Sequence, residues 1–436
     1  MAGRKRVSVA VATGVGIGAI VGAGIFVLSG SVIALAGSAW LSISAFVLVG
    51  IIAMLVALEL GELGSIFPNS TGSSYSYVYN AFGKGAGFVT GLMMYFSYSA
   101  GVAVIALGFG SYLAGMLGLA SGFYPAVLGI ILVLALAIVN LLGIKKAAGL
   151  DFLLVLVKIC ILIAFAAFAA FYAYSKGPSN FFSVSSASGG STGNLLAAGI
   201  TLFFAYTGFQ SISTFTSKIK GGAKGAARAI ILSVAISMLV YVMVVVALLL
   251  LAPASSYTVG MADPLAFALK NAAAPSLLLI AVGIGALVAT ASATLSWLLT
   301  ASRVMYQIGA DGLIPRSLSV YDRKRDVASN ATILSAVIGM LMLLLLGNIY
   351  VIASIANFGL LFTYLMMSLA LLHFIRHGRR GTFRMPFGTF LSLITIAALV
   401  LFLYGLSVYS LLAGGAVAIL LIIIYVSGVK RRPPFK

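Results

Sequence analysis

Long apolar segments separated by short polar stretches run through the whole chain of 436 residues. A helix that crosses a membrane needs about 20 mostly apolar residues. Several segments exceed that length, so we expect tilted or interrupted helices. The predicted spans are residues 8–36, 41–66, 86–117, 123–143, 152–174, 194–217, 229–252, 275–302, 331–347, 349–374, 387–407 and 409–428. The pattern therefore predicts an all-α integral membrane protein with twelve transmembrane helices.

The polar stretches between these segments are too short for a soluble domain. The longest are residues 175–193, 253–274 and 303–330. The first apolar run, from Val7 to Ala36, is longer than the about 7–15 residues of a signal peptide core, so it is interpreted as a span. We expect a single membrane domain over residues 1–436.

Composition narrows the class of protein. The chain is 62% hydrophobic and 8% charged, whereas soluble domains are about 25% charged. This excludes a water-soluble, disordered or coiled-coil protein. The single cysteine, Cys160, and the two histidines, His373 and His377, argue against disulfides and a histidine-rich or cysteine-rich metal site. We expect no metal and no cofactor.

The 26 basic residues against 7 acids give a net charge of +19. When the N-terminus is placed in the cytoplasm, 23 of the 26 fall in inner segments, Lys176 and Lys270 fall in outer loops, and Lys158 falls within a span. Basic inner loops are typical of membrane proteins and contact anionic lipid. The charge therefore indicates topology rather than nucleic acid binding, with both termini cytoplasmic.

Two spans look interrupted. The first contains Gly14, Gly16, Gly18, Gly22 and Gly24, and each glycine weakens a helix by about 1 kcal/mol relative to alanine. A packing face between helices is the alternative explanation.

The sixth span carries hydroxyls, a glycine and an amide within the stretch 203–210. Interruptions five spans apart indicate an inverted-repeat transporter with a binding site near the membrane midplane. The repeats are predicted over 1–174 and 194–375, with two further spans in 386–428. Helix ends at such breaks offer N–H groups to a carboxylate and C=O groups to an ammonium, which fits an α-amino acid.

Four stretches carry a family resemblance. They are Gly22–Phe26, like G-x-G-I-F; Glu59–Gly83, like E-L-x-x-x-x-P-x-x-G-G-x-Y-x-Y followed by A-F-G; Phe204–Phe209; and Ser302–Pro315, like S-R-x-x-Y-x-x-x-x-D-G-x-x-P. The chain resembles the amino acid–polyamine–organocation (APC) transporter superfamily, which has the LeuT-type fold. The resemblance implies a five-plus-five inverted repeat with two appended helices, and one substrate site between broken spans one and six.

The resemblance also assigns site residues. Backbone N–H groups of Gly22, Ala23 and Gly24 would bind the substrate carboxylate. Carbonyls near Ala19, Ile20, Phe203 and Phe204 would bind its amine. The Phe204 ring would be an aromatic gate, Gly208 would lie in the break of span six, and Tyr95 would line the pocket from span three. In departure from the family pattern, Lys218 replaces an acid, two prolines after it are missing, and Gln210 stands where many relatives carry an acid.

Lys158 lies deep in span five, where a charge costs about 2.5–3.5 kcal/mol on insertion scales. Snorkelling of the side chain to the membrane surface is the structural alternative. Certain APC members resemble this chain in having a lysine where sodium symporters bind a second sodium ion, next to spans one and eight. Ala289, Ser292 and Ala293 are the span-eight candidates. Lys158 is therefore predicted to carry the coupling proton in a sodium-independent transporter.

The predicted class of substrate follows from the positions of the acidic residues. All seven lie in loops or near span ends, and Glu59 and Glu62 are expected to pair with inner-loop arginines such as Arg303. A cationic side chain would have no carboxylate partner at the midplane. The sequence thus predicts proton-coupled transport of small or medium neutral L-amino acids across a prokaryotic plasma membrane. Exchange, or transport of cationic amino acids or polyamines, stays open as an alternative, and a membrane-embedded enzyme is a distant one. Oligomeric state and stoichiometry are left open.

Overall fold

The computed structural model describes residues 7–70, 73–119, 122–178, 192–261, 263–322, 324–346 and 349–429. The regular secondary structure of these ranges is helical, and their β-pairing is limited to two isolated bridges, Val7–Ile219 and Asp322–Val327. The prediction of an all-α membrane protein is confirmed. Some residues that the predicted motifs, loops and basic inner segments include lie outside the described ranges: Gly72, residues 179–191, Arg323, and the basic residues of 1–6 and 430–436.

Among the described residues, eleven helical segments are long and apolar enough to cross a membrane. Nine of them each correspond to one helix: α4 (Ala39–Ile66), α5 (Ser74–Met116), α6 (Tyr124–Leu142), α7 (Ile144–Lys176), α11 (Gly222–Leu251), α13 (Ser276–Ala310), α14 (Ser329–Leu346), α15 (Ile349–Arg376) and α17 (Val408–Ile424). The other predicted span is the apolar helix α16 (Gly388–Tyr404), which has 17 residues. Short connecting elements are η3 (Ala254–Ser256), α12 (Pro264–Asn271), η4 (Arg316–Ser319) and the π-helical η5 (Tyr425–Val429).

Several helices extend beyond the predicted spans, because a helix does not have to end where the apolar segment ends. Helices α7 and α11 begin at Ile144 and Gly222, and α13 continues to Ala310. The largest difference is in α5, which begins at Ser74 rather than near residue 86. A backbone break at Gly83, with φ of 84°, separates its polar first turns from the apolar span.

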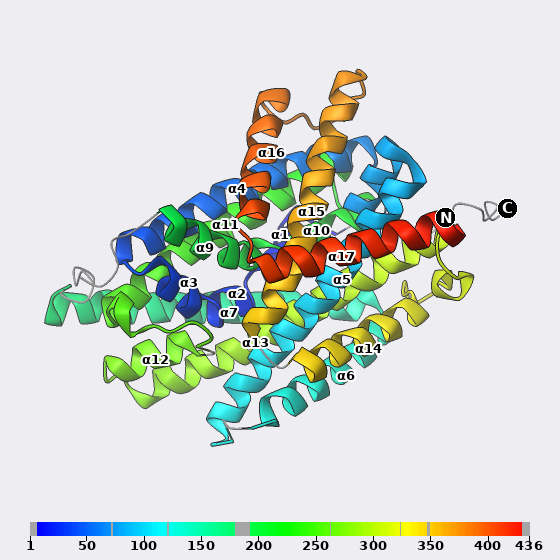
Figure 1. Cartoon of the computed structure of the whole chain (residues 1–436). Coiled ribbons are helices and arrows are strands. Elements are labelled where there is room, and N and C mark those ends of the chain that lie inside the picture. The colour runs from blue at the N-terminus through cyan, green and yellow to red at the C-terminus, as the bar shows by residue number, and fades with distance from the viewer. Residues whose placement is uncertain are drawn as a thin grey trace.

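Both predicted interruptions are present. The first span consists of α1 (Val9–Ile20), α2 (Ala23–Phe26) and α3 (Ser29–Ala36). The sixth consists of α9 (Thr192–Phe203), η1 (Phe204–Tyr206), α10 (Gln210–Ser213) and η2 (Thr216–Lys218). Figure 1 shows α1, α2 and α10 near the centre of the bundle.

The two interruptions lie directly against each other. Gly208 has a φ of 116°, a backbone conformation that disfavours a side chain, and a Cβ there would lie 2.6 Å from the Ala19 carbonyl oxygen. A Cβ on Gly24 would lie 2.4 Å from the Ala205 Cα. The glycines therefore let the two broken segments meet backbone to backbone.

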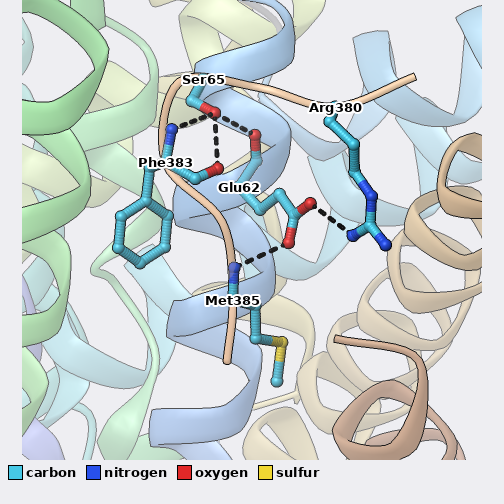
Figure 2. Close-up of polar contacts among 5 residues, drawn as sticks. All are labelled: Glu62, Ser65, Arg380, Phe383 and Met385. Carbon is cyan, nitrogen blue, oxygen red and sulfur yellow. Dashed lines mark hydrogen bonds and ion pairs between the residues drawn. The ribbon is translucent and has the colours of Figure 1, made fainter. Parts of the chain in front are cut away.

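One end of the bundle, which we call the basic end, carries Val7, Lys218, Asp326 and Arg380. There the loop between α15 and α16 is fastened to α4 (Figure 2). Arg380 Nη1 lies 3.0 Å from Glu62 Oε1, and the Met385 N–H donates to Glu62 Oε2 at 2.9 Å.

Ser65 extends this attachment, because its Oγ donates to the Phe383 carbonyl at 3.1 Å and accepts from the Phe383 N–H at 3.2 Å. An arginine does pair with Glu62, but the suggested Arg303 is wrong. Its Nη1 donates to the Thr214 carbonyl and Oγ1 at 3.1 and 2.8 Å. Arg303 is on α13, beside the end of the broken sixth span.

Close packing of α5 on α13 fixes one large side chain of the core. Trp297 is buried, and a Cβ on Gly101 would lie only 1.9 Å from its ring. The missing side chain at Gly101 therefore sets the position of the indole. From there the ring reaches Tyr98 and Phe204, with centroid distances of 4.9 and 5.0 Å.

Replacing Gly101 by alanine is expected to destabilise the protein by about 1–3 kcal/mol, the usual cost of overpacking a core. The matched control is Gly115→Ala on the same helix, where an added Cβ meets no atom within 4 Å. Thermal unfolding of the purified protein measures both. Equal unfolding temperatures for the two variants would contradict this account of the packing.

Candidate functional site

The break after α1 releases backbone carbonyls near the middle of the protein. Lys158 on α7 is fully buried, and its Nζ donates to the carbonyls of Gly18 and Val21 at 2.8 and 2.7 Å. It also donates to Ser292 Oγ on α13 at 3.2 Å. Lys158 thus joins three helices. The side chain does not snorkel to a surface, and of the three span-eight candidates Ser292 makes the direct contact.

The two carbonyls between Gly18 and Val21, those of Ala19 and Ile20, accept hydrogen bonds from aromatic side chains. Trp297 Nε1 donates to Ala19 O at 3.2 Å. The Tyr241 hydroxyl on α11 lies 2.7 Å from Ile20 O and 2.9 Å from Ala205 O. Tyr241 therefore bridges the first and the sixth span at their interruptions. Two of the four carbonyls predicted to bind an amine, those of Ala19 and Ile20, therefore accept hydrogen bonds from side chains.

A small cavity lies between the two interruptions. Its lining residues are Ala19, Ile20, Gly22, Gly24, Ile105, Phe204, Thr207, Ala293 and Trp297. Its volume of about 10 Å³ is close to the minimum that holds one water molecule. The structure therefore shows this site in a closed form, which must expand before a larger molecule enters.

Five predicted site residues line the cavity: Ala19, Ile20, Gly22, Gly24 and Phe204. Two other predicted residues lie next to the cavity along the backbone. Ala23 begins α2, whose first N–H groups have no partner within that helix. Gly208 borders the region through its close approach to Ala19.

The side chains of Phe203 and Tyr95 are not in the lining of this cavity. The Phe203 ring packs on Tyr364 and Phe402, at 5.7 and 5.9 Å. The Tyr95 hydroxyl is 3.4 Å from Ser335 Oγ. Helix α5 instead contributes Ile105, ten residues after Tyr95 and about 15 Å farther along a helix. Helix α5 therefore borders this cavity through Ile105 rather than through Tyr95.

Four lining residues were not predicted to bind substrate: Ile105, Thr207, Trp297 and Ala293, the last of which was named only as a candidate to face Lys158. A signal existed for Trp297, because an indole N–H in the middle of a span needs an acceptor. Thr207 Oγ1 donates to the Phe204 carbonyl at 2.7 Å. None of the nine lining residues carries a charge.

Gln210, the amide in place of an acid, belongs to a neutral network beside the cavity. Its Oε1 accepts from the Tyr98 hydroxyl at 3.0 Å, and its Nε2 donates to Ser74 Oγ at 3.3 Å. Gln210 thus connects α10 to α5 without introducing a titratable group.

The basic end is closed below the cavity. Lys218 forms an ion pair with Asp326, which also accepts a hydrogen bond from the Tyr321 hydroxyl. The backbone of Val7 pairs with that of Lys218 and Lys220, with N···O distances of 2.9 and 2.8 Å. Burial alone raises the pKa of Asp326, but hydrogen bonds from Lys218 and Tyr321 outweigh it and hold that pKa below its ordinary value.

Known proteins resemble the chain over most of its length. The branched-chain amino acid permease of Bacillus subtilis (strain 168) is 28% identical over 378 residues, which are 82% of this chain and 78% of that protein. The methylthioribose transporter of the same organism is 28% identical over 411 residues, 90% of this chain and 86% of that protein. A mitochondrial cationic amino acid transporter of Arabidopsis thaliana is 24% identical over 378 residues, 82% of this chain and 60% of that protein.

These relatives are transporters rather than enzymes. The family model described as amino acid permease matches residues 7–429, which include both interruptions, Lys158 and the cavity. The chain is therefore a multi-pass membrane protein that belongs to the amino acid permease family.

Proposed function

We propose that this permease transports neutral amino acids together with protons, independently of sodium, by alternating access to the cavity between its two broken spans. The observation that carries the proposal is the contact of the Lys158 ammonium with the carbonyls of Gly18 and Val21. The basic end is placed in the cytoplasm of a prokaryotic cell. The two broken segments belong to inverted repeats over 1–174 and 194–375.

The contacts of Lys158 link its protonation to the position of α1. A lysine ammonium has three N–H donors, and Gly18 O, Val21 O and Ser292 Oγ are all in hydrogen-bond range. The positive charge also lies at the C-terminal end of α1, where the helix dipole favours a cation. Loss of the proton removes both the charge and one donor. The attachment of α1 to α13 then weakens, which allows the first span to move.

The substrate amine has acceptors in the same segment. The carbonyls of Ala19 and Ile20 bind Trp297 and Tyr241 in the closed form. A substrate ammonium competes for these carbonyls and is the stronger donor because it is charged. The first N–H groups of α2 face the negative end of the substrate, as helix N-termini do. Carboxylate and amine thus bind to two sides of one break.

A neutral side chain fits the rest of the lining. Ile105, Ala293, Phe204 and Trp297 present apolar surface, and no lining residue neutralises a cation. One relative is named a branched-chain amino acid permease, and branched-chain amino acids have the neutral, apolar side chains that such a lining fits. Transport of cationic amino acids is the alternative, because the plant relative is named a cationic amino acid transporter. Exchange of one amino acid for another uses the same site without net proton movement.

Lys218 and Asp326 form the inner gate in this proposal. The family pattern has an acid at the position of Lys218, and here the acid is supplied by Asp326 on the loop before α14. The gate therefore still contains an ion pair, but the basic residue is at position 218 and the acid is at position 326. Opening toward the basic end requires this pair and the Val7–Ile219 bridge to separate.

Replacing Lys158 by methionine is expected to reduce uptake driven by a pH gradient by about tenfold or more, equivalent to about 1.4 kcal/mol. The reason is that two buried carbonyls lose their donor, and each unsatisfied group costs about 1–3 kcal/mol. Uptake into proteoliposomes, with pH and sodium gradients imposed separately, measures it. Lys176→Met, at the exposed end of the same helix, is the control. Sodium-driven uptake by the wild type, or full proton coupling in Lys158→Met, would refute the proposal.

A panel of competing substrates tests the neutral lining. Leucine, isoleucine, valine and alanine are expected to inhibit uptake of one another, whereas lysine, arginine and putrescine are expected to leave it unchanged, because burying an unpaired ammonium is costly. Competition for labelled leucine in proteoliposomes gives the result. Saturable uptake of lysine or putrescine would show that the cavity accepts a cation after all.

Replacing Asp326 by asparagine is expected to open the gate more often, by roughly fivefold for about 1 kcal/mol of lost pairing. The readout is alkylation of Thr207→Cys in a Cys160→Ser background, with an impermeant reagent added at the basic end of inside-out vesicles. Asp322→Asn is the control, since Asp322 pairs with Arg325 instead. No increase over that control would exclude the pair as a gate.

The lowered pKa of Asp326 gives this gate a defined pH response. Stabilisation by a carboxylate with a lowered pKa is present above its ordinary value and is lost as pH falls through the lowered one. The ratio of the alkylation rates of Asp326→Asn and the wild type cancels the pH dependence of the thiolate itself, and it should therefore stay constant across neutral pH. A ratio that changes between mildly acidic and neutral pH would assign the gate to another group.

A further inference from the structure

A buried acid lies outside the cavity and the gate. Glu59 on α4 has no exposed surface. Its carboxyl group contacts Ser368 Oγ on α15, and Ser392 and Thr395 of α16 face the same group. Three helices therefore meet around one acid that the proposed transport mechanism does not use.

The charges around Glu59 do not compensate a carboxylate. Glu62, less than one turn farther along α4, holds Arg380 and the Met385 N–H (Figure 2). Within the described part of the chain, Glu62 is the titratable group that interacts with Glu59, and it carries a like charge. Helices α15 and α16 offer hydroxyl groups alone to this carboxyl group. An unpaired buried carboxylate is costly, so the surroundings favour a neutral acid.

The number of hydrogen atoms available for hydrogen bonds at this junction also favours a neutral acid. Ser368 Oγ also lies 3.0 Å from the Tyr364 carbonyl, and one hydroxyl has a single hydrogen to donate. A carboxylate at Glu59 would compete with Tyr364 for that hydrogen. A protonated Glu59 instead donates its own O–H to Ser368 Oγ, and Ser368 then donates to Tyr364.

The second carboxyl oxygen of Glu59, Oε1, lies in an equally buried environment. Glu59 Oε1 and Ser392 Oγ are both buried without a hydrogen-bond partner among the described residues. A buried oxygen without a donor is costly, and it is costlier in a carboxylate, which spreads its negative charge over both oxygens, than in a neutral acid. The lack of a donor at Oε1 therefore also favours a protonated Glu59.

We propose that Glu59 is a protonated carboxylic acid at neutral pH, and that the junction of α4, α15 and α16 is a proton-binding site separate from Lys158. Release of this proton leaves a charge that water must reach, so the junction has to loosen. Transport is therefore inhibited at alkaline pH. The inference rests on contacts other than those of Lys158 and stands whether or not Lys158 carries the coupling proton.

Infrared spectroscopy of the full chain in lipid tests the protonation directly. The C=O stretch of a carboxylic acid is separate from the bands of a carboxylate, and the chain has only seven acidic side chains. We expect a carboxylic acid band at neutral pH that is lost in Glu59→Gln and kept in the matched control Glu62→Gln. Absence of the band from the wild type, or its loss in Glu62→Gln alone, would overturn the proposal.

Stability and transport provide a second readout. Glutamine keeps the size of the protonated acid, so Glu59→Gln is expected to unfold within about 2 °C of the wild type, a shift of less than about 1 kcal/mol. It should also reduce the loss of leucine uptake at alkaline pH, because the contribution of Glu59 to that loss is removed. Failure of Glu59→Gln to fold, or an unchanged alkaline limb, contradicts the proposal. A sodium-induced rise in unfolding temperature that Glu59→Gln abolishes would show a cation in place of the proton.

Discussion

The ammonium of Lys158 and the carbonyls released by the break in the first span depend on each other. A lysine in the middle of a membrane protein needs acceptors, and a broken helix at that depth needs donors. The distances of 2.7 and 2.8 Å to Val21 and Gly18 satisfy both needs at once. If either partner is removed, the other becomes an unsatisfied buried group. The broken conformation of α1, and with it the cavity, rests on this contact.

Small residues then determine how closely the other parts approach. Gly24 and Gly208 bring the sixth span against the first, and Gly101 makes room for Trp297. Tyr241 bridges Ile20 and Ala205, so that the two interruptions are held together by one hydroxyl. The result is a closed site whose acceptors are already oriented. Its neutral lining and the ion pair at the basic end are consistent with a transporter that opens alternately to the two sides.

Much of this arrangement was predictable from the sequence because membrane helices leave strong local signals. The lengths of the apolar segments predicted the spans, and glycines and polar residues within spans predicted both interruptions. Lys158 was recognised because it lies within a span rather than in a loop. Choices that depend on long-range packing were not predictable. Ile105 rather than Tyr95 faces the cavity, and Arg380 rather than Arg303 pairs with Glu62. Such contacts depend on the rotation of each helix about its axis and on the path of each loop, and neither produces a periodic pattern in the sequence.

Proton movement during substrate uptake tests the central claim most directly. A pH-sensitive dye in the medium around wild-type proteoliposomes reports protons removed while labelled leucine enters. The account predicts that the medium becomes alkaline in proportion to the leucine taken up, with or without sodium. Leucine accumulation without any proton movement, or movement only when sodium is present, would contradict it.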